Sequence, residues 1–173
     1  MDHYKPKDAP ASSQEVRASA LFVDLDQTTL EGTATRMTDD EIRNDKLIET
    51  TISLINRARS IGVPVVMVSR NTRMAIDRVL DIRPDIAMLF DEILPCESTK
   101  SGLINGYLKS KDIDPENGVF IDDNDSELTD VEKNSCGVSA VNTIMGGKIQ
   151  LGRMKKSHYG SELAYADNIA LAA

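Results

Sequence analysis

Two aspartates separated by one residue, Asp24 and Asp26, end the apolar stretch ALFVDLD. A strand that buries residues 21–23 has no structural need to finish on two like charges. Paired carboxylates suit a divalent cation, because Mg²⁺ prefers oxygen ligands. Taken alone, the pair would equally suit a turn, where Asp side chains hydrogen-bond to nearby backbone groups.

Further polar residues stand at the ends of other apolar segments. Ser69 closes the run VPVVMVS, Asp122 and Asp123 close NGVFIDD, and Lys100 precedes the segment leading to that run. Each has a plain structural explanation: a helix N-cap for Ser69, a solvated surface residue for Lys100, and a dipole-stabilised helix start for residues 122–127. Their joint occurrence favours an active site.

Short apolar runs alternate with amphipathic segments along the whole chain. This alternation predicts an α/β fold with a Rossmann-like parallel sheet of about five strands and helices on both faces. A polar loop is expected between the first strand and Asn44. The expected strands span residues 20–24, 63–69, 86–90, 117–122 and 137–141, and the expected helices span residues 45–62, 71–82, 99–113 and 125–135.

Two of these helices carry an apolar stripe that should face the sheet. In residues 45–62 it comprises Leu47, Ile48, Ile52, Ile55 and Ala58, and in residues 71–82 it comprises Met74, Ile76, Val79 and Leu80. We expect three parts in the chain. These are a flexible tail over residues 1–17, a catalytic core over 18–142, and a tail over 143–173 whose helix, over 161–173, packs on the core.

Ligands of an open parallel sheet bind at the carboxyl ends of its strands, so the polar residues named above should meet in one cleft. Two carboxylates 4 Å apart repel by about 4 kcal/mol at the dielectric constant of a protein surface. A domain is stable by only about 5–15 kcal/mol. The carboxylates must therefore be protonated or neutralised by a cation, and Lys100 alone cannot offset four of them. An all-oxygen ligand set is the preference of Mg²⁺, which we expect as the cofactor.

The four segments, in this order, resemble the motifs of phosphatases of the haloacid dehalogenase (HAD) superfamily. FVDLDQT is similar to the first motif, VVMVSRN to the second, Lys100 in STKSG to the third, and VFIDDNDSE to the fourth. The resemblance covers residues 20–141. Within the superfamily, the chain is similar to small magnesium-dependent phosphatases and to the glyceryl-transferring proteins of polyketide pathways.

The resemblance implies a mechanism for the acidic residues. Asp24 would be the nucleophile that forms an aspartyl-phosphate, while Asp26 would protonate the leaving group and then activate water. Magnesium would bind the Asp24 carboxylate, the Asp26 main-chain carbonyl and the Asp123 carboxylate. Asp122 would act on the metal through water.

The resemblance also implies roles for the remaining motif residues. Ser69 and Lys100 would hold the phosphoryl oxygens, where charge accumulates in the transition state. Thr28 would brace the turn and orient Asp26. Arg70 is a further candidate for phosphate binding.

The roles of four positions stay open. Arg70 and its neighbour Asn71 suit phosphate support or helix capping equally. Gln27 stands where the family often has glycine, and it could change the approach of the substrate. Glu127 stands where many relatives have aspartate.

The spacing between the motifs bears on the substrate. There is no room for a domain-sized cap after Asp24 or between Ser69 and Lys100, although residues 31–44 could form a small flap. An open site favours a macromolecular substrate such as a phosphoprotein, including one that carries phosphotyrosine. The alternatives are a small-metabolite phosphatase, a glyceryl- or acyl-transfer module acting on a carrier-bound substrate, and a non-catalytic phosphate-binding domain.

The composition limits the partners. The chain has 173 residues, of which 40% are hydrophobic, and its net charge is −8. Nucleic-acid binders usually gain affinity from a basic surface, so nucleic acid is not an expected partner. No apolar run reaches the ~20 residues of a membrane span, and the N-terminus lacks the apolar region of a signal peptide. We expect a cytoplasmic protein, with export into another cell left open.

Overall fold

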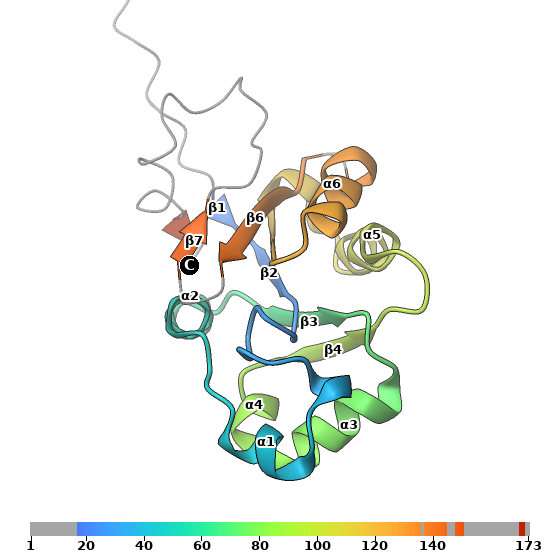
Figure 1. The fold of residues 1–173 in the computed structure, drawn as a ribbon. Helices are drawn as coiled ribbons and strands as arrows, with labels where there is room; N and C mark the ends of the chain where they lie inside the picture. The colour runs from blue at the N-terminus through green and yellow to red at the C-terminus, as the bar shows by residue number, and fades with distance from the viewer. Residues whose placement is uncertain (1–16, 136, 145–147, 151–169, 172–173) are drawn as a thin grey trace, which may run out of the picture.

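The computed structural model describes residues 17–135, 137–144, 148–150 and 170–171 of the chain, and its centre is one six-stranded sheet (Figure 1). The strands lie in the order β4-β3-β2-β5-β6-β7. The first five are parallel, as the sequence predicts, and β7 adds an antiparallel edge. Their bounds are β2 Ala20–Val23, β3 Val65–Ser69, β4 Glu92–Pro95, β5 Gly118–Asp122, β6 Ser139–Ile144 and β7 Lys148–Gln150.

Helices cover both faces of the sheet, which confirms the α/β prediction (Figure 1). One face packs against α1 (Asp39–Asn44), α2 (Glu49–Ser60), α3 (Arg73–Ile82) and α4 (Pro84–Ala87). The other packs against α5 (Lys100–Ser110) and α6 (Asp125–Asn134). Two short 3₁₀ helices, η1 (Ala34–Arg36) and η2 (Pro115–Asn117), lie in the connections.

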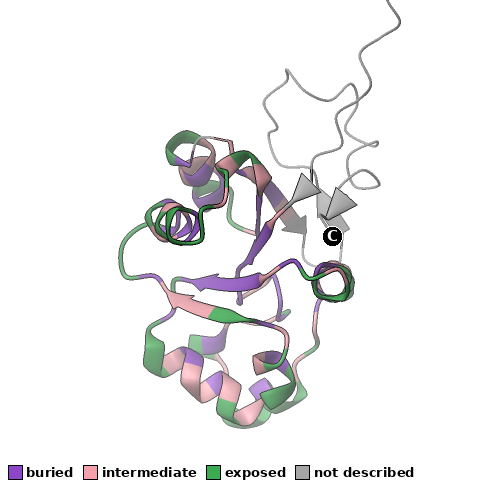
Figure 2. Ribbon diagram, turned by 180° about the vertical axis from the view of Figure 1, so that it is seen from behind, coloured by how far each residue is buried: buried purple, intermediate pink, exposed green. Residues whose placement is uncertain are grey.

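The alternation of side chains along β2 explains why both faces are covered. Leu21 and Val23 join the cluster under α1–α4, whereas Ala20 and Phe22 join the cluster under α5 and α6. Successive residues of a strand point to opposite faces, so an all-apolar strand must be buried on both. Figure 2 shows the central strands buried in this way, while the edge strand β4 is partly exposed.

The predicted strand over residues 86–90 is wrong. Pro84–Ala87 form the short helix α4, and the strand of this region is β4, which begins at Glu92. Pro84 stands in the first turn of α4, where its missing N–H costs nothing and its fixed φ favours a helix. Ile86 is fully buried against the other helices of that face, so the apolar signal came from a helix.

Two details of the helix predictions also need correction. Met74 was expected in the buried stripe of α3, but it is 81% exposed. A helix was expected over residues 161–173, but residues 170–171 form strand β8 (Ala170–Leu171), which pairs in parallel with β1 (Arg17–Ala18). The rest of that segment, and residues 1–16 of the expected N-terminal tail, lie outside the described residues.

The connection after β2 contains more structure than the polar loop that the sequence predicts. Residues 31–44, here called the flap, contain η1 and α1. Helix α1 begins with a capping box, in which the Thr38 side chain accepts from Glu41 N–H and the Glu41 carboxylate accepts from Thr38 N–H. Within the described residues no domain-sized cap follows β2 or β3. Nor does any described helix have the length and apolar character that a membrane crossing requires.

Candidate active site

The strand ends converge on one cavity, as the parallel sheet predicts. Asp24 follows β2, Ser69 ends β3, and Asp122 ends β5. Residues from all three ends line a cavity of about 270 Å³. The lining residues are Asp24, Asp26, Gln27, Thr33, Arg36, Ser69, Arg70, Lys100, Asp122, Asp123, Asn124 and Glu127.

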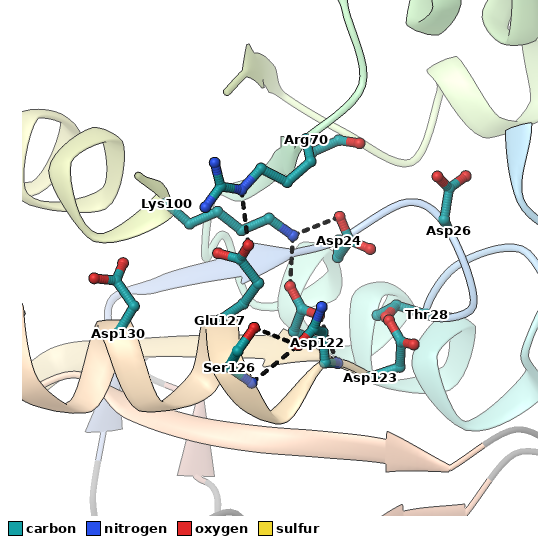
Figure 3. A network of polar contacts seen from close by, with 12 residues as sticks. Asp24, Asp26, Thr28, Arg70, Lys100, Asp122, Asp123, Ser126, Glu127 and Asp130 are labelled. Carbon is teal, nitrogen blue, oxygen red and sulfur yellow. Dashed lines mark hydrogen bonds and ion pairs between the residues drawn. The ribbon is translucent and has the colours of Figure 1, made fainter. Parts of the chain in front are cut away.

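Lys100 lies at the centre of the buried charges (Figure 3). Its Nζ donates to Asp24 Oδ1 at 2.7 Å and to Asp122 Oδ2 at 2.5 Å. All three side chains are buried, and Lys100 is only 2% exposed. Lys100 is therefore a buried partner of the two carboxylates, and the alternative of a solvated surface lysine is excluded.

The pKa values show the cost of gathering these charges. Burial, followed by repulsion from Asp122, raises the pKa of Asp24 well above its usual range, against the opposing effect of Lys100. Burial raises the pKa of Asp122 to about 6, again against Lys100. Burial would lower the pKa of Lys100, but Asp24 and Asp122 outweigh it and raise that pKa to about 12. The single positive charge of Lys100 therefore does not balance the negative charge of the surrounding carboxylates.

The acidic residues are close enough together to hold a metal ion. Asp24, Asp122 and Asp123 each offer a carboxylate oxygen, and these oxygens lie within 4.8 Å of one another. Asp123 is partly exposed at the cavity, and burial raises the pKa of its carboxyl. An all-oxygen donor set with excess negative charge fits Mg²⁺.

Asp26 is held by two groups that the sequence did not connect with it. Its Oδ2 accepts from Asn71 Nδ2, and its Oδ1 accepts from the backbone N–H of Ala34, both at 2.8 Å. Asn71 Nδ2 also donates to Ser69 Oγ at 3.1 Å. The Thr28 hydroxyl lies 3.5 Å from Asp123 Oδ1. Asn71 thus links Asp26 to Ser69, and the flap contributes to fixing Asp26.

Ser69 does not act as a helix N-cap, which is the structural alternative that its sequence position suggests. The N-cap of α3 is Thr72, whose hydroxyl accepts from Ala75 N–H at 3.3 Å. Ser69 Oγ is buried and accepts from the backbone N–H of Asn71 at 3.3 Å. Ser69 therefore lines the cavity at the end of β3 without capping the helix.

Arg70 is fixed by an ion pair that joins two of the motifs (Figure 3). Its Nε donates to Glu127 Oε1 at 2.7 Å, and its Nη1 donates to the Ser98 carbonyl. Glu127 is buried, and its Oε2 has no hydrogen-bond partner among the described residues. The bond to Glu127 raises the pKa of the Arg70 guanidinium. Local sequence patterns do not reveal this pair, because its members are 57 residues apart.

The backbone at Gln27 explains why glycine suits this position. Gln27 has φ +54°, in the left-handed region that glycine adopts most easily. Its N–H donates to the Gly32 carbonyl at 3.1 Å, which closes the loop between β2 and the flap. Gln27 therefore keeps the turn and adds a side chain to the cavity wall.

Solved structures of the HAD superfamily share this arrangement of strands and helices. The phosphatase-containing N-terminal part of a Bacteroides fragilis protein, solved with magnesium, has a TM-score of 0.62 at 18% identity over 75% of this chain. A haloacid dehalogenase-like protein from Streptococcus pneumoniae has a TM-score of 0.55 at 16% identity over 75% of this chain. The present chain spans 37% of the first protein and 86% of the second.

The chain has the HAD fold. A HAD family enzyme from Bacteroides thetaiotaomicron, solved with magnesium and inorganic phosphate, also shares it, with a TM-score of 0.54 at 12% identity over 76% of this chain and 96% of its own. At these identities the likeness establishes the fold alone. No protein-family model matches the sequence, and no curated protein sequence matches it.

Proposed function

We propose that the protein is a Mg²⁺-dependent phosphomonoester hydrolase that acts through an aspartyl-phosphate. The observation that carries this proposal is the convergence of Asp24, Asp122 and Asp123, with oxygens within 4.8 Å, around the buried ammonium of Lys100. A cleft with this much negative charge can receive a phosphate ester only when a cation offsets the repulsion. The HAD fold of the chain is consistent with this chemistry.

The residues can perform the two steps of the reaction. An oxygen of Asp24 attacks phosphorus, and the bond from phosphorus to the leaving oxygen breaks as Asp26 gives that oxygen a proton. Water then attacks phosphorus, Asp26 takes its proton, and the bond to Asp24 breaks to release inorganic phosphate. Lys100 and Ser69 stabilise the phosphoryl oxygens, and Arg70 is placed at the same cavity.

Asp24, Asp123 and the Asp26 carbonyl would hold the metal, with Asp122 acting through water. When bound, Mg²⁺ would supply positive charge that offsets the carboxylates and the charge on the phosphoryl oxygens. The hydrogen bonds from Asn71 and Ala34 keep the Asp26 carboxylate in one place. Asp24 and Asp26 can thus take different roles, one as nucleophile and the other as proton carrier.

The substrate that we propose is macromolecular, such as a phosphoprotein, including one that carries phosphotyrosine. The flap is the covering element between β2 and α2, and it contains one short 3₁₀ helix and one helix of six residues. A large substrate can reach an active site of this kind, whereas a domain-sized cap would exclude it.

The proposal is tested by hydrolysis of p-nitrophenyl phosphate with Mg²⁺ and with EDTA. We expect release of p-nitrophenol that requires the metal and is lost in Asp24→Asn. Asp26→Asn should keep the fold, measured by circular dichroism, and lose most of the turnover. Equal turnover in Asp24→Asn and the parent protein would refute the assignment of Asp24 as the nucleophile. A panel of phosphopeptides, carrier-bound substrates and small phosphate esters then distinguishes the substrate classes.

A further inference from the structure

Three of the described residues that line the cavity are basic, and two of these three are already paired with acids. Lys100 is bound to Asp24 and Asp122, and Arg70 to Glu127. The third, Arg36, is exposed and lines the cavity from η1 of the flap. Its side chain forms no hydrogen bond or ion pair with any other residue that the structure describes.

This lack of a partner sets Arg36 apart from the other arginines of the flap and α3. Arg43 pairs with Asp40, Arg73 pairs with Asp77, and Arg78 pairs with Asp39. Arg83, which follows α3, pairs with Asp85. Acidic residues are plentiful in this region, yet none of the described ones pairs with Arg36.

The segment that carries Arg36 is anchored on both sides. Ala34 N–H donates to Asp26 Oδ1 at 2.8 Å, and the Met37 carbonyl accepts from Arg78 Nη2 at 2.9 Å. At the base of the flap, Gly32 N–H donates to Asp45 Oδ2 at 2.9 Å. The backbone of Arg36 is therefore held at the cavity by groups that include the proposed general acid, Asp26. The anchored backbone keeps the guanidinium near the cavity, so that only the side chain of Arg36 has to be ordered when a ligand binds.

We infer that Arg36 recognises a second anionic group on the substrate, carried by the leaving group beside the phosphate ester. This inference rests on the proposed function and narrows its substrate class. A carboxylate is the ligand that best matches the planar guanidinium, which can donate two parallel hydrogen bonds. The carboxylate can come from an acidic residue next to a phosphorylated side chain, or from a small phosphorylated acid.

The net charge of −8 excludes a general electrostatic explanation for a preference for anionic substrates. The field of the whole molecule repels anions, so a preference for a more negative substrate cannot come from general attraction. Such a preference requires a cation close to the second anionic group, and the proposed Mg²⁺ is assigned to the phosphate ester itself. Arg36 is the one cavity cation, among the described residues, that is not neutralised by a carboxylate of the protein.

The experiment compares matched substrate pairs in the parent protein and in Arg36→Gln. The first pair is 4-carboxyphenyl phosphate and phenyl phosphate, and the second is a phosphotyrosine peptide with Glu or with Gln beside the phosphotyrosine. We expect the parent to favour the carboxylated member by about tenfold in kcat/KM, the usual effect of one good charged contact. In Arg36→Gln the ratio should fall to about one, and Arg36→Lys should keep part of it.

A control and a binding measurement separate this inference from the proposed function. Arg43→Gln, on the same flap but outside the cavity, should leave both ratios unchanged. Calorimetry with 4-carboxyphenylphosphonate and phenylphosphonate, which cannot be hydrolysed, measures recognition without turnover. If the phosphonates show a binding preference that depends on Arg36, but the protein hydrolyses none of the phosphate esters, the inference is supported and the proposed function is refuted.

Hydrolysis with no carboxylate preference in the parent, or with a preference that survives Arg36→Gln, would overturn the inference and leave the function standing. The two substrate pairs distinguish the source of the carboxylate. A preference limited to the peptides indicates a protein substrate, and one limited to the aryl phosphates indicates a small molecule.

Discussion

Replacement of Lys100 by Met should destabilise the protein by an amount that depends on pH. Lys100 Nζ lies 2.7 Å from Asp24 and 2.5 Å from Asp122. At an effective dielectric constant of about 20, each pair is worth about 6–7 kcal/mol of attraction, much of which is offset by desolvation. Removal of one partner from a buried ion pair typically costs about 3–5 kcal/mol, and we expect that loss in Lys100→Met near pH 8.

The pH dependence follows from the two carboxyls. Their pKa values in the folded protein are raised, to about 6 for Asp122, so the folded state binds more protons than the unfolded state between about pH 4 and the folded pKa. Stability therefore falls as the pH rises through this window. Without Lys100 both pKa values rise further, and the penalty of Lys100→Met should shrink near pH 5, where protonation neutralises the acids.

Urea unfolding of the parent and Lys100→Met, near pH 5 and pH 8 in EDTA, measures this difference. Lys109→Met is the matched control, because Lys109 is exposed on the same helix. We expect it to change the free energy of unfolding by less than about 0.5 kcal/mol. A loss in Lys100→Met that is equal at both pH values, or below about 1 kcal/mol at pH 8, would refute the electrostatic account.

Three further predictions follow from the contacts of the site. Asn71→Ala removes the side-chain donor that positions the Asp26 carboxylate, so kcat should fall about tenfold; an unchanged kcat would contradict the role of Asn71. Glu127→Gln weakens the hold on Arg70, so KM for p-nitrophenyl phosphate should rise several-fold, while an unaltered KM would remove Arg70 from substrate binding. Mg²⁺ should raise the melting temperature more near pH 8 than near pH 5, because protons compete with the metal for Asp24 and Asp122, whose pKa values are raised. Equal shifts in melting temperature at the two pH values would argue against metal binding by these carboxyls.

The parallel sheet and the grouping of the acidic residues could be predicted from the sequence because both depend on local patterns. Short apolar runs rich in β-branched residues, such as residues 65–68, are typical of strands buried on two faces, and the strand ends of a parallel sheet share one edge. The resulting meeting of Asp24, Asp122 and Asp123 follows from topology. Residues 86–90 misled the prediction because a short buried helix and a buried strand give the same apolar signal.

The contacts that orient the site could not be predicted, because they join residues far apart in the sequence. Asn71 reaches Asp26 across 45 positions, and Arg70 reaches Glu127 across 57. The sequence of the flap is typical of a loop because its helices are short and mostly polar. Its contribution to the site is the hydrogen bond that the Ala34 N–H donates to Asp26, which no sequence pattern predicts. The spacing of Thr38 and Glu41 matches the sequence pattern of a capping box, and this pattern could have been used to predict the start of α1.

A crystal structure with Mg²⁺ and beryllium trifluoride, which mimics a phosphoryl group on a carboxylate, tests the central claim most directly. We expect beryllium on a side-chain oxygen of Asp24 and one magnesium ion shared by Asp24 and Asp123. The claim would be contradicted by crystals soaked in both reagents in which the metal lies away from these two carboxylates, or in which Asp24 remains unmodified while another residue carries the beryllium.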